Sequence, residues 1–363
     1  MKAQNAAARG AVGIITIQAP EFSQRYKWSW LIPQIRARGM WWLDSRGVPA
    51  DTVPEIRARA LMNESGALAL FAGAAKRLPE IFAASRESKS GSFVLPMRVK
   101  IHTVSRHTPI ESHNVIAKLA GSDPKLAQEY VVFTAHVDHL GICRPSEEDA
   151  ICHGAWDNAS GTSAVLEVAR AFSSLPGPPR RSILFVFVTG EEKGLLGSDY
   201  FAHFPTVPIE NIVADVNIDG APGLLWPNKD LVPLGVEHSS LSKDVEAAAR
   251  NMGYTISPDP IPEEVIFIRS DQYSFVKQGV PAVFMNPGMQ SANLKIDGAA
   301  VFHKWISSIY HTPKDNMSQQ FYFDWAARST GLSFLVGYEV AQQAERPTWN
   351  AGDFFGTKFA RKH

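Results

Sequence analysis

Residues 181–192, RSILFVFVTGEE, decide the fold. The apolar run at 183–188 is much shorter than the ~20 residues of a membrane-spanning helix, and its composition predicts a strand. Apolar residues without alternation indicate that both faces of this strand are covered, as in the middle of a parallel sheet. The strand is followed at once by a glycine and two carboxylates, Glu191 and Glu192.

Strands and helices alternate on both sides of this stretch. The pattern predicts further strands at residues 99–104, 114–119, 130–135, 212–218, 231–236 and 282–286. It predicts helices at residues 160–173, 240–251, 271–278 and 323–344. Alternation of helices with buried strands is typical of an α/β fold with three layers, in which helices cover both faces of a mostly parallel sheet.

The first 90 residues differ from the rest. Four of the nine tryptophans fall in one short stretch, Trp28, Trp30, Trp41 and Trp42. We interpret them as the core of a small domain rather than as an exposed recognition surface. The small, polar stretch AASRESKSGS at 83–92 predicts a linker. The sequence therefore predicts two domains, residues 1–92 and 93–363.

The composition of the chain excludes several classes of protein. The 363 residues are 45% apolar and 20% charged, which is typical of a globular protein and argues against disorder. The formal net charge is zero, so we expect no nucleic-acid partner, and the absence of a long apolar run predicts no membrane association. Cys143 and Cys152 are too few for a disulfide scaffold; they are either one disulfide across a loop or two free thiols.

Five short segments place a histidine or a carboxylate just after a predicted strand or at a strand-to-helix turn. They are AHVDH (135–139), GAWDN (154–158), GEE (190–192), NIDG (217–220) and YHTPKDN (310–316). The carboxyl ends of parallel strands meet at one edge of a sheet, so these side chains should converge there. So many carboxylates in one cleft repel one another unless cations neutralise them. An open set of imidazole and carboxylate ligands is the catalytic type of zinc site, and it also suits manganese or cobalt.

The ordered set AHVDHLG, GAWDNASGTS, TGEEKGLLGS, NIDG, RSDQYSF and YHTPKDN resembles the co-catalytic dizinc aminopeptidase family. That family includes aminopeptidase Y, bacterial leucyl aminopeptidases, glutamate carboxypeptidase II and the glutaminyl cyclases. The resemblance covers residues 99–344. It implies the three-layer αβα fold of zinc exopeptidases, which is of the phosphorylase/hydrolase-like type.

The resemblance implies a set of metal ligands. His136 and Asp219 would bind one zinc ion, Glu192 and His311 would bind the other, and Asp157 would bridge both. The chain would therefore hold two Zn²⁺ ions, with Co²⁺ or Mn²⁺ as substitutes. In the family the peptide bond after the bridging aspartate is often cis, and we expect the same here.

The resemblance also implies catalytic roles. Glu191 matches the general base, which takes a proton from a metal-activated water and passes it to the leaving amine. Asp138 matches the carboxylate that orients His136, and Tyr310 matches a hydroxyl that donates to the developing oxyanion. The substrate is then a peptide. The negative cluster suits its positively charged N-terminal amine, which favours an aminopeptidase.

Three alternatives to an aminopeptidase stay open. A dizinc carboxypeptidase or dipeptidase needs a cationic clamp for the substrate carboxylate, for which Arg269 is a candidate. A glutaminyl cyclase is a transferase of the same fold that works with one zinc ion. A receptor-like module without catalysis would have lost ligands, and this chain keeps them.

Several neighbouring residues allow two interpretations. Trp156 either walls a substrate pocket or packs beneath the site. Asp271 either caps a helix or contacts substrate, and Gln272 stands where the family often has histidine. The remaining histidines with no matching metal role are interpreted as structural or surface residues: His139, His153, His203, His238 and His303.

The N-terminal region resembles part of a protease-associated domain, at residues 2–17 and 57–71. The resemblance implies that the chain begins partway into this domain. It also implies a longer precursor that is secreted or periplasmic, although the sequence shows no targeting signal. The strands missing from such a domain would expose a sheet edge, so we expect a homodimer.

Overall fold

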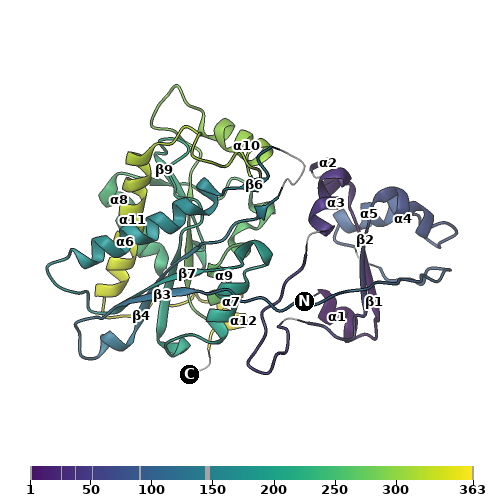
Figure 1. Cartoon of the computed structure of the whole chain (residues 1–363), viewed down its shortest axis with the longest axis horizontal. Helices are drawn as coiled ribbons and strands as arrows, with labels where there is room; N and C mark the ends of the chain where they lie inside the picture. The colour runs from purple at the N-terminus through teal and green to yellow at the C-terminus, as the bar shows by residue number, and fades with distance from the viewer. Residues whose placement is uncertain are drawn as a thin grey trace. The chain divides into compact units, whose positions relative to one another are not determined.

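The computed structural model describes residues 2–25, 27–36, 38–50, 52–89, 91–143 and 148–361. The chain divides into two compact units, Met1–Ile110 and Glu111–His363. Figure 1 shows the elements of both units, and each unit is described by itself.

The first unit is built around a short parallel pair of strands. Strand β1 (Gly13–Ile17) pairs with β2 (Ala58–Met62). Its helices are α1 (Lys2–Ala7), α2 (Pro20–Arg25), α3 (Trp28–Arg36), α4 (Glu64–Leu70) and α5 (Leu78–Arg86). Because α5 extends to Arg86, the linker predicted from residue 83 is wrong over its first four residues. The domain boundary after residue 92 and the likeness to a protease-associated domain stay predictions.

The tryptophans of the first unit do not form its core. Trp41 is 52% exposed, and Trp28 and Trp42 are only partly buried. The buried apolar residues of this unit are instead smaller side chains, among them Ala67 and Leu78. The predicted tryptophan core is therefore wrong for these three residues, and the side chain of Trp30 lies outside the described part.

The second unit contains a seven-stranded sheet with the order β10-β9-β11-β8-β4-β7-β3. The four neighbouring pairs β10–β9, β11–β8, β8–β4 and β4–β7 are parallel, whereas β9–β11 and β7–β3 are antiparallel. The strands are β3 (Val115–Leu119), β4 (Tyr130–His136), β7 (Ser182–Val188), β8 (Ile212–Asn217), β9 (Asp230–Leu234), β10 (Thr255–Ile256) and β11 (Ala282–Pro287). The prediction of a mostly parallel sheet is confirmed.

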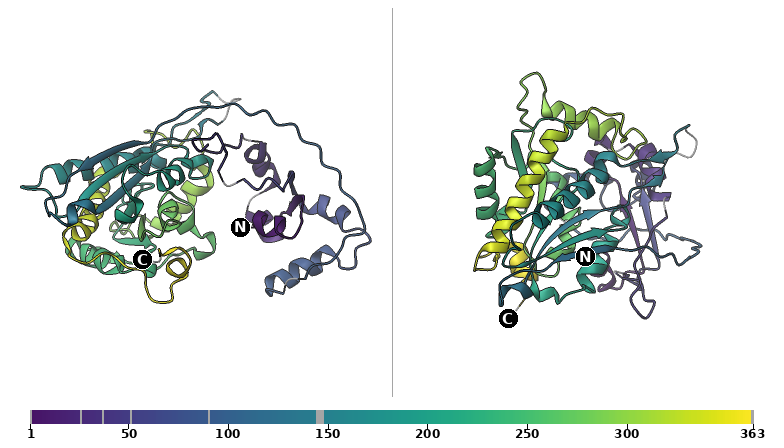
Figure 2. Two further views of the ribbon diagram at one scale, coloured as in Figure 1. Left: turned by 90° about the horizontal axis from the view of Figure 1, so that it is seen from below. Right: turned by 60° about the vertical axis from the view of Figure 1, so that its left-hand side comes forward.

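Helices cover both faces of this sheet, as Figures 1 and 2 show. One face packs against α6 (Gly161–Ser173), α8 (Leu241–Met252) and α11 (Phe323–Gln342). The other packs against α7 (Leu196–His203) and α9 (Gln272–Val276), with α12 (Phe354–Phe359) beside α9. A further helix, α10 (Gly298–Ser308), lies outside these layers. The predicted three-layer α/β architecture is confirmed.

The apolar run of β7 is explained by its two covered faces. Alternate side chains of the strand enter two different cores, one beneath α6 and α11 and the other beneath α7 and α9. The first core receives Ile183, Phe185 and Phe187, and the second receives Leu184, Val186 and Val188. A strand buried on both sides has no polar face, so its sequence shows no alternation.

One predicted strand is absent. Residues 99–104 are irregular, and Val99 and Val104 are 52% and 86% exposed. The alternation of apolar and basic residues in this segment resembles a half-buried strand, but among the described residues no strand pairs with it. The sheet begins instead with β3, whose pairing with β7 is antiparallel.

A small hairpin follows β4. Its strands β5 (Gly141–Ile142) and β6 (Ile151–Cys152) are antiparallel, and Cys143 and Cys152 form a disulfide. The two-thiol alternative is therefore wrong. Among the described residues, helices long and apolar enough to cross a membrane are absent.

The contact between α11 and the sheet gives a test of the packing. A Cβ atom added at Gly337 would lie 2.1 Å from the ring of Phe133, which is fully buried and has no room to shift. We expect Gly337→Ala to lower the free energy of unfolding by about 1–3 kcal/mol, measured by chemical denaturation.

Gly331 on the same helix is the matched control. An added Cβ there would meet only the end of Met252, at an ordinary 3.5 Å. Gly331→Ala should be neutral or stabilising by up to about 1 kcal/mol, because alanine favours the helix. Equal losses in the two variants would contradict this account of the α11 packing.

Candidate active site

Three adjacent strands bring the predicted site residues together. Strand β4 lies between β8 and β7 and is parallel to both. His136 is the last residue of β4 and is opposite Val188, so the turn with Glu191 and Glu192 begins beside it. Asp219 follows the end of β8 on the other side. The carboxyl ends of neighbouring parallel strands thus supply three of the segments found in the sequence.

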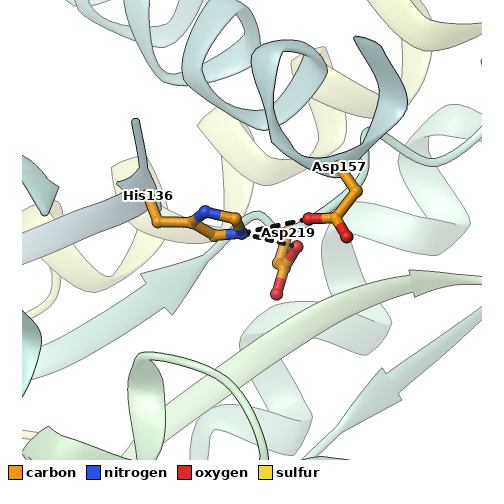
Figure 3. Close-up of side chains that lie close together, drawn as sticks. All are labelled: His136, Asp157 and Asp219. Carbon is orange, nitrogen blue, oxygen red and sulfur yellow. Dashed lines mark hydrogen bonds and ion pairs between the residues drawn. The ribbon is translucent and has the colours of Figure 1, made fainter. Parts of the chain in front are cut away.

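His136 faces two carboxylates. Its Nε2 atom lies 3.2 Å from Oδ1 of Asp219 and 3.3 Å from Oδ1 of Asp157, as Figure 3 shows. Its Nδ1 atom lies 3.0 Å from the carbonyl oxygen of Asp138. Because a carbonyl oxygen only accepts, Nδ1 carries a proton. In a neutral ring Nε2 would then be free to bind a metal ion placed between it and the two carboxylates. This is the tautomer that a metal ligand requires.

Asp157 connects this group to a second one. Its Oδ2 atom lies 3.4 Å from Nε2 of His311, and the same Nε2 atom lies 3.2 Å from Oε2 of Glu192. The two oxygens of one carboxylate therefore face two different histidines. The structure brings all five predicted metal ligands into one cluster with Asp157 in the middle.

The cluster fits two cations. His136, Asp157 and Asp219 each offer one ligand atom within 4.8 Å of one another. Asp157 is also part of a second such group, whose other members are Glu192 and His139. His311 Nε2 is buried and makes no hydrogen bond to the described residues, as expected of an atom that is left for a metal. Nitrogen and oxygen donors without sulfur suit a catalytic zinc site.

The pKa values reflect crowded negative charge. Burial raises the pKa of Glu191 well above its usual range, and the charge of Asp219 raises it further. Burial would raise the pKa of Asp157 too, but contacts with His136 and His311 outweigh it and hold the pKa below its usual range. Burial lowers the pKa of His311, yet Asp157 and Glu192 raise it to about 9. Without cations, the cluster thus draws positive charge from its histidines.

Asp157 is held by the backbone around it. It lies in the one-turn segment η2 (Ala155–Ser160), and the Asp157–Asn158 peptide bond is cis, as the resemblance implied. The carboxylate of Asp315 accepts hydrogen bonds from the N–H groups of Trp156 and Asp157, at 3.0 and 3.1 Å. Asp315 is fully buried and follows His311 by four residues. The loop with His311 therefore also fixes the position of Asp157.

The side chain of Asn158 ties η2 to two further elements. Its Oδ1 accepts from the N–H groups of Gly161, at the start of α6, and Gly220, both at 2.9 Å. Its Nδ2 donates to the carbonyl of Ile218 at 3.1 Å. Gly220 follows Asp219 directly, so Asn158 links the segment of the central carboxylate to the segment of Asp219.

Asp138 contacts two site residues in different ways. Its carboxylate Oδ1 accepts from the N–H of Glu191 at 3.2 Å, whereas the same atom is 3.8 Å from Nδ1 of His136. The orientation of His136 that was predicted for this carboxylate thus comes mainly from the carbonyl oxygen of Asp138. The carboxylate mainly holds the turn of Glu191.

Tyr310 lies against the second group. Its ring stacks on His311 with centroids 3.7 Å apart and also contacts Trp305. Burial, and then the charges of Asp157 and Glu192, raise the pKa of Tyr310 well above its usual value. The hydroxyl therefore stays protonated and is able to donate, and its role at the oxyanion stays a prediction.

Trp156 packs beneath the site. It is 7% exposed, its Nε1 donates to the carbonyl of Ala221, and its ring contacts Trp305 at 4.6 Å. The atoms of its ring also fill the space where Gly220 would carry a Cβ atom. The structure therefore favours the packing interpretation over the pocket wall.

Asp271 and Gln272 are both buried. Gln272 donates to the carbonyl of Phe267 and accepts from Asn217, so its amide is used internally. Asp271 precedes α9 but makes no side-chain cap, and both its oxygens lack a hydrogen-bond partner among the described residues. Burial is the main reason why the pKa of Asp271 rises to about 7. The interpretation of Asp271 as a helix cap is wrong.

Sequence reasoning missed three residues that contact the predicted ligands. Ser270 donates to Oδ2 of Asp219 at 2.7 Å, and Asp315 holds the backbone of Asp157. His139, interpreted as structural or surface, is 7% exposed and lies with Nδ1 2.6 Å from Oε1 of Glu192, so the surface alternative is wrong. All three stand inside the quoted motifs, but only the folded chain shows which ligand each one meets.

Comparisons with known proteins identify the family of the chain. The profile of peptidase family M28 matches residues 114–328. Aminopeptidase NAALADL1 of Mus musculus is 33% identical over 136 residues, which are 36% of this chain and 16% of that protein. A probable zinc metalloprotease of Pyrenophora teres f. teres is 32% identical over 111 residues, which are 31% of this chain and 23% of that protein. The aligned part thus spans less than a quarter of either relative.

Two solved structures of aminopeptidases align with part of this chain. A zinc aminopeptidase from Bacillus subtilis aligns with a TM-score of 0.47 and 23% identity, over 63% of this chain and 50% of that one. An aminopeptidase from Aneurinibacillus sp. strain AM-1 aligns with a TM-score of 0.47 and 23% identity, over 65% of this chain and 49% of that one. Since the family profile covers more than half of the residues, the chain belongs to peptidase family M28.

Proposed function

We propose that this protein is a dizinc aminopeptidase, which removes N-terminal residues from peptides. The observation that carries the proposal is the placement of Asp157, whose two oxygens face His136 and His311. A carboxylate with one oxygen toward each of two histidines is suited to bridge two ions. The general base proposed for the reaction, Glu191, directly precedes one of the proposed ligands.

His136 and Asp219 would hold one zinc ion and Glu192 and His311 the other, with Asp157 shared. Two such ions would supply Lewis-acid activation of the water and of the substrate carbonyl. The names of relatives support zinc, since a similar fungal protein is a probable zinc metalloprotease. The donor set of the site supports it as well.

Glu191 would move the proton. As water adds to the peptide carbonyl carbon, the carboxylate of Glu191 accepts one of its protons. As the C–N bond breaks, Glu191 passes that proton to the leaving nitrogen. The hydrogen bond from the N–H of Glu191 to Asp138 holds this residue at its turn. A carboxylate that cycles a proton in this way contributes about 10²–10⁴-fold to the rate.

Tyr310 would stabilise the oxygen of the substrate carbonyl. Its hydroxyl keeps its proton because burial and the nearby carboxylates raise its pKa. A donor of this kind contributes about 2.7–4 kcal/mol in comparable oxyanion sites. Stacking on His311 fixes the plane of the tyrosine ring.

The charge of the site favours a substrate amine over a substrate carboxylate. The three carboxylate ligands offset three of the four positive charges of two zinc ions. Asp138 and Glu191 add negative charge beside them. The cation considered for a carboxylate clamp, Arg269, is paired with Glu264 at 3.1 Å. A positively charged N-terminus therefore suits this cleft better than a C-terminus does.

Metal content tests the two-ion site. We expect two zinc ions per chain by elemental analysis of protein dialysed against zinc. Asp219→Asn should weaken the binding of one zinc ion only. Asp157→Asn should weaken the binding of both ions, because Asp157 is the shared ligand. Loss of a single ion in Asp157→Asn, with the other held as in wild type, would contradict a bridging role.

Substrate preference tests the exopeptidase type. We expect the zinc-loaded protein to cleave aminoacyl-p-nitroanilides and to leave their N-acetylated counterparts intact, because acetylation removes the positive amine. Cleavage of both sets at equal rates would contradict an aminopeptidase. Silence on both sets, with release of C-terminal residues from peptides or cyclisation of N-terminal glutamine, would show carboxypeptidase or cyclase chemistry instead.

Glu191→Gln tests the general base. The amide has the same shape but takes up no proton, so we expect kcat to fall by about 10²–10⁴-fold while both zinc ions remain bound. Glu167→Gln on the exposed side of α6 is the control, since the side chain of Glu167 is 56% exposed and pairs with Arg170. Full activity in Glu191→Gln would overturn the mechanism.

A further inference from the structure

His139 lies inside the metal cluster, and its ring, Asp157 and Glu192 each offer one donor atom within 4.8 Å of one another. Its side chain is only 7% exposed, and its Nδ1 atom lies 2.6 Å from Oε1 of Glu192. Neither of its ring nitrogens makes a regular hydrogen bond to the described residues. Burial of unpaired polar groups lowers the stability of a protein. A buried imidazole directed at a buried carboxylate therefore indicates a function for the pair.

The ring of His139 is enclosed on two sides. On one side is Gly154, where an added Cβ atom would lie 2.7 Å from Cγ of the imidazole. On another side the ring of His311 meets it edge-on, with centroids 5.5 Å apart. The backbone and the neighbouring ligand therefore hold His139 against Glu192.

The two oxygens of Glu192 face different histidines. Oε2 lies 3.2 Å from Nε2 of His311, and Oε1 lies 2.6 Å from Nδ1 of His139. Two ligands of one tetrahedral zinc ion, with bonds of ~2.0–2.1 Å, are about 3.3 Å apart. The pair Glu192–His311 has nearly this separation, whereas the pair Glu192–His139 is too close for a shared ion. The short separation indicates direct contact between the imidazole and the carboxylate, although it is below the ~2.7–3.2 Å of an ordinary N–H···O hydrogen bond.

The first group of the cluster repeats this arrangement. Asp219 directs Oδ1 at His136 and receives a hydrogen bond from Ser270 on Oδ2 at 2.7 Å. In each group, one carboxylate oxygen faces the ligand histidine and the other is held by a donor outside the ligand set. His139 occupies, for Glu192, the place that Ser270 occupies for Asp219.

We propose that His139 is a positioning residue that donates its Nδ1 proton to Oε1 of Glu192 and thereby sets the affinity of the second metal ion. The inference rests on the dizinc site proposed above. Outer partners of this kind fix the direction of a ligand, and their loss typically weakens metal binding by about 10–100-fold.

The test measures zinc affinity rather than activity. His139→Leu removes the donor, and we expect one of the two zinc sites, that of Glu192 and His311, to lose about 10–100-fold in affinity in competition with a chelating dye. His139→Gln keeps an N–H donor and should stay within about threefold of wild type. His153→Leu is the control, because His153 is an exposed histidine of the same region, paired with Asp149. Circular dichroism would verify that each variant is folded.

A second readout separates a positioning residue from a direct ligand. In the cobalt-substituted protein, each ligand histidine should give one exchangeable, hyperfine-shifted N–H resonance, so we expect two, from His136 and His311. A third resonance that disappears in His139→Gln would show that His139 is a ligand and would overturn the proposal. So would an unchanged zinc affinity in His139→Leu. A wild-type chain that holds fewer than two zinc ions would instead contradict the function proposed above.

Discussion

The site depends on one shared carboxylate. Asp157 lies between His136, at the end of a central strand, and His311, in a distant loop, and presents one oxygen to each. If this carboxylate turned, neither group could keep its geometry. The surrounding structure fixes it from several directions, through the hydrogen bonds from its own backbone and that of Trp156 to Asp315 and through the side chain of Asn158. The ties to Asp315 and from Asn158 to Gly220 join segments that are far apart in the sequence.

The same cluster carries stored electrostatic repulsion. Glu191 and Asp271 are buried near other carboxylates, and burial raises the pKa of both. The backbone of His311 is also strained, because its φ of +57° is a left-handed conformation that is uncommon for a non-glycine residue. Features of this kind concentrate at functional sites, where the rest of the fold stabilises them. Two bound cations would relieve this repulsion. The folded chain therefore places its carboxylates where positive charge from bound ions would stabilise them.

The sequence predicted most of the second unit because its signals are local. A run such as that of β7 has no polar face and therefore indicates a strand covered on both sides. The wrong predictions fall where burial depends on a partner. Residues 99–104 have the pattern of a strand but lack a neighbour, and Trp41 is exposed although tryptophans commonly fill a core. A pattern in the sequence shows what a segment could bury, and not whether another segment is there to cover it.

For the site, the sequence by itself determined which residues could act. The histidines and carboxylates stand directly after strands, and parallel strands bring their carboxyl ends to one edge, so the convergence of the five proposed ligands follows from order and spacing. Only the tertiary structure decided which atoms face which. It assigned the separate oxygens of Glu192 to His311 and His139, and it placed Ser270 on Asp219. Side-chain direction depends on packing between segments that are remote in the chain, and that information is absent from any single motif.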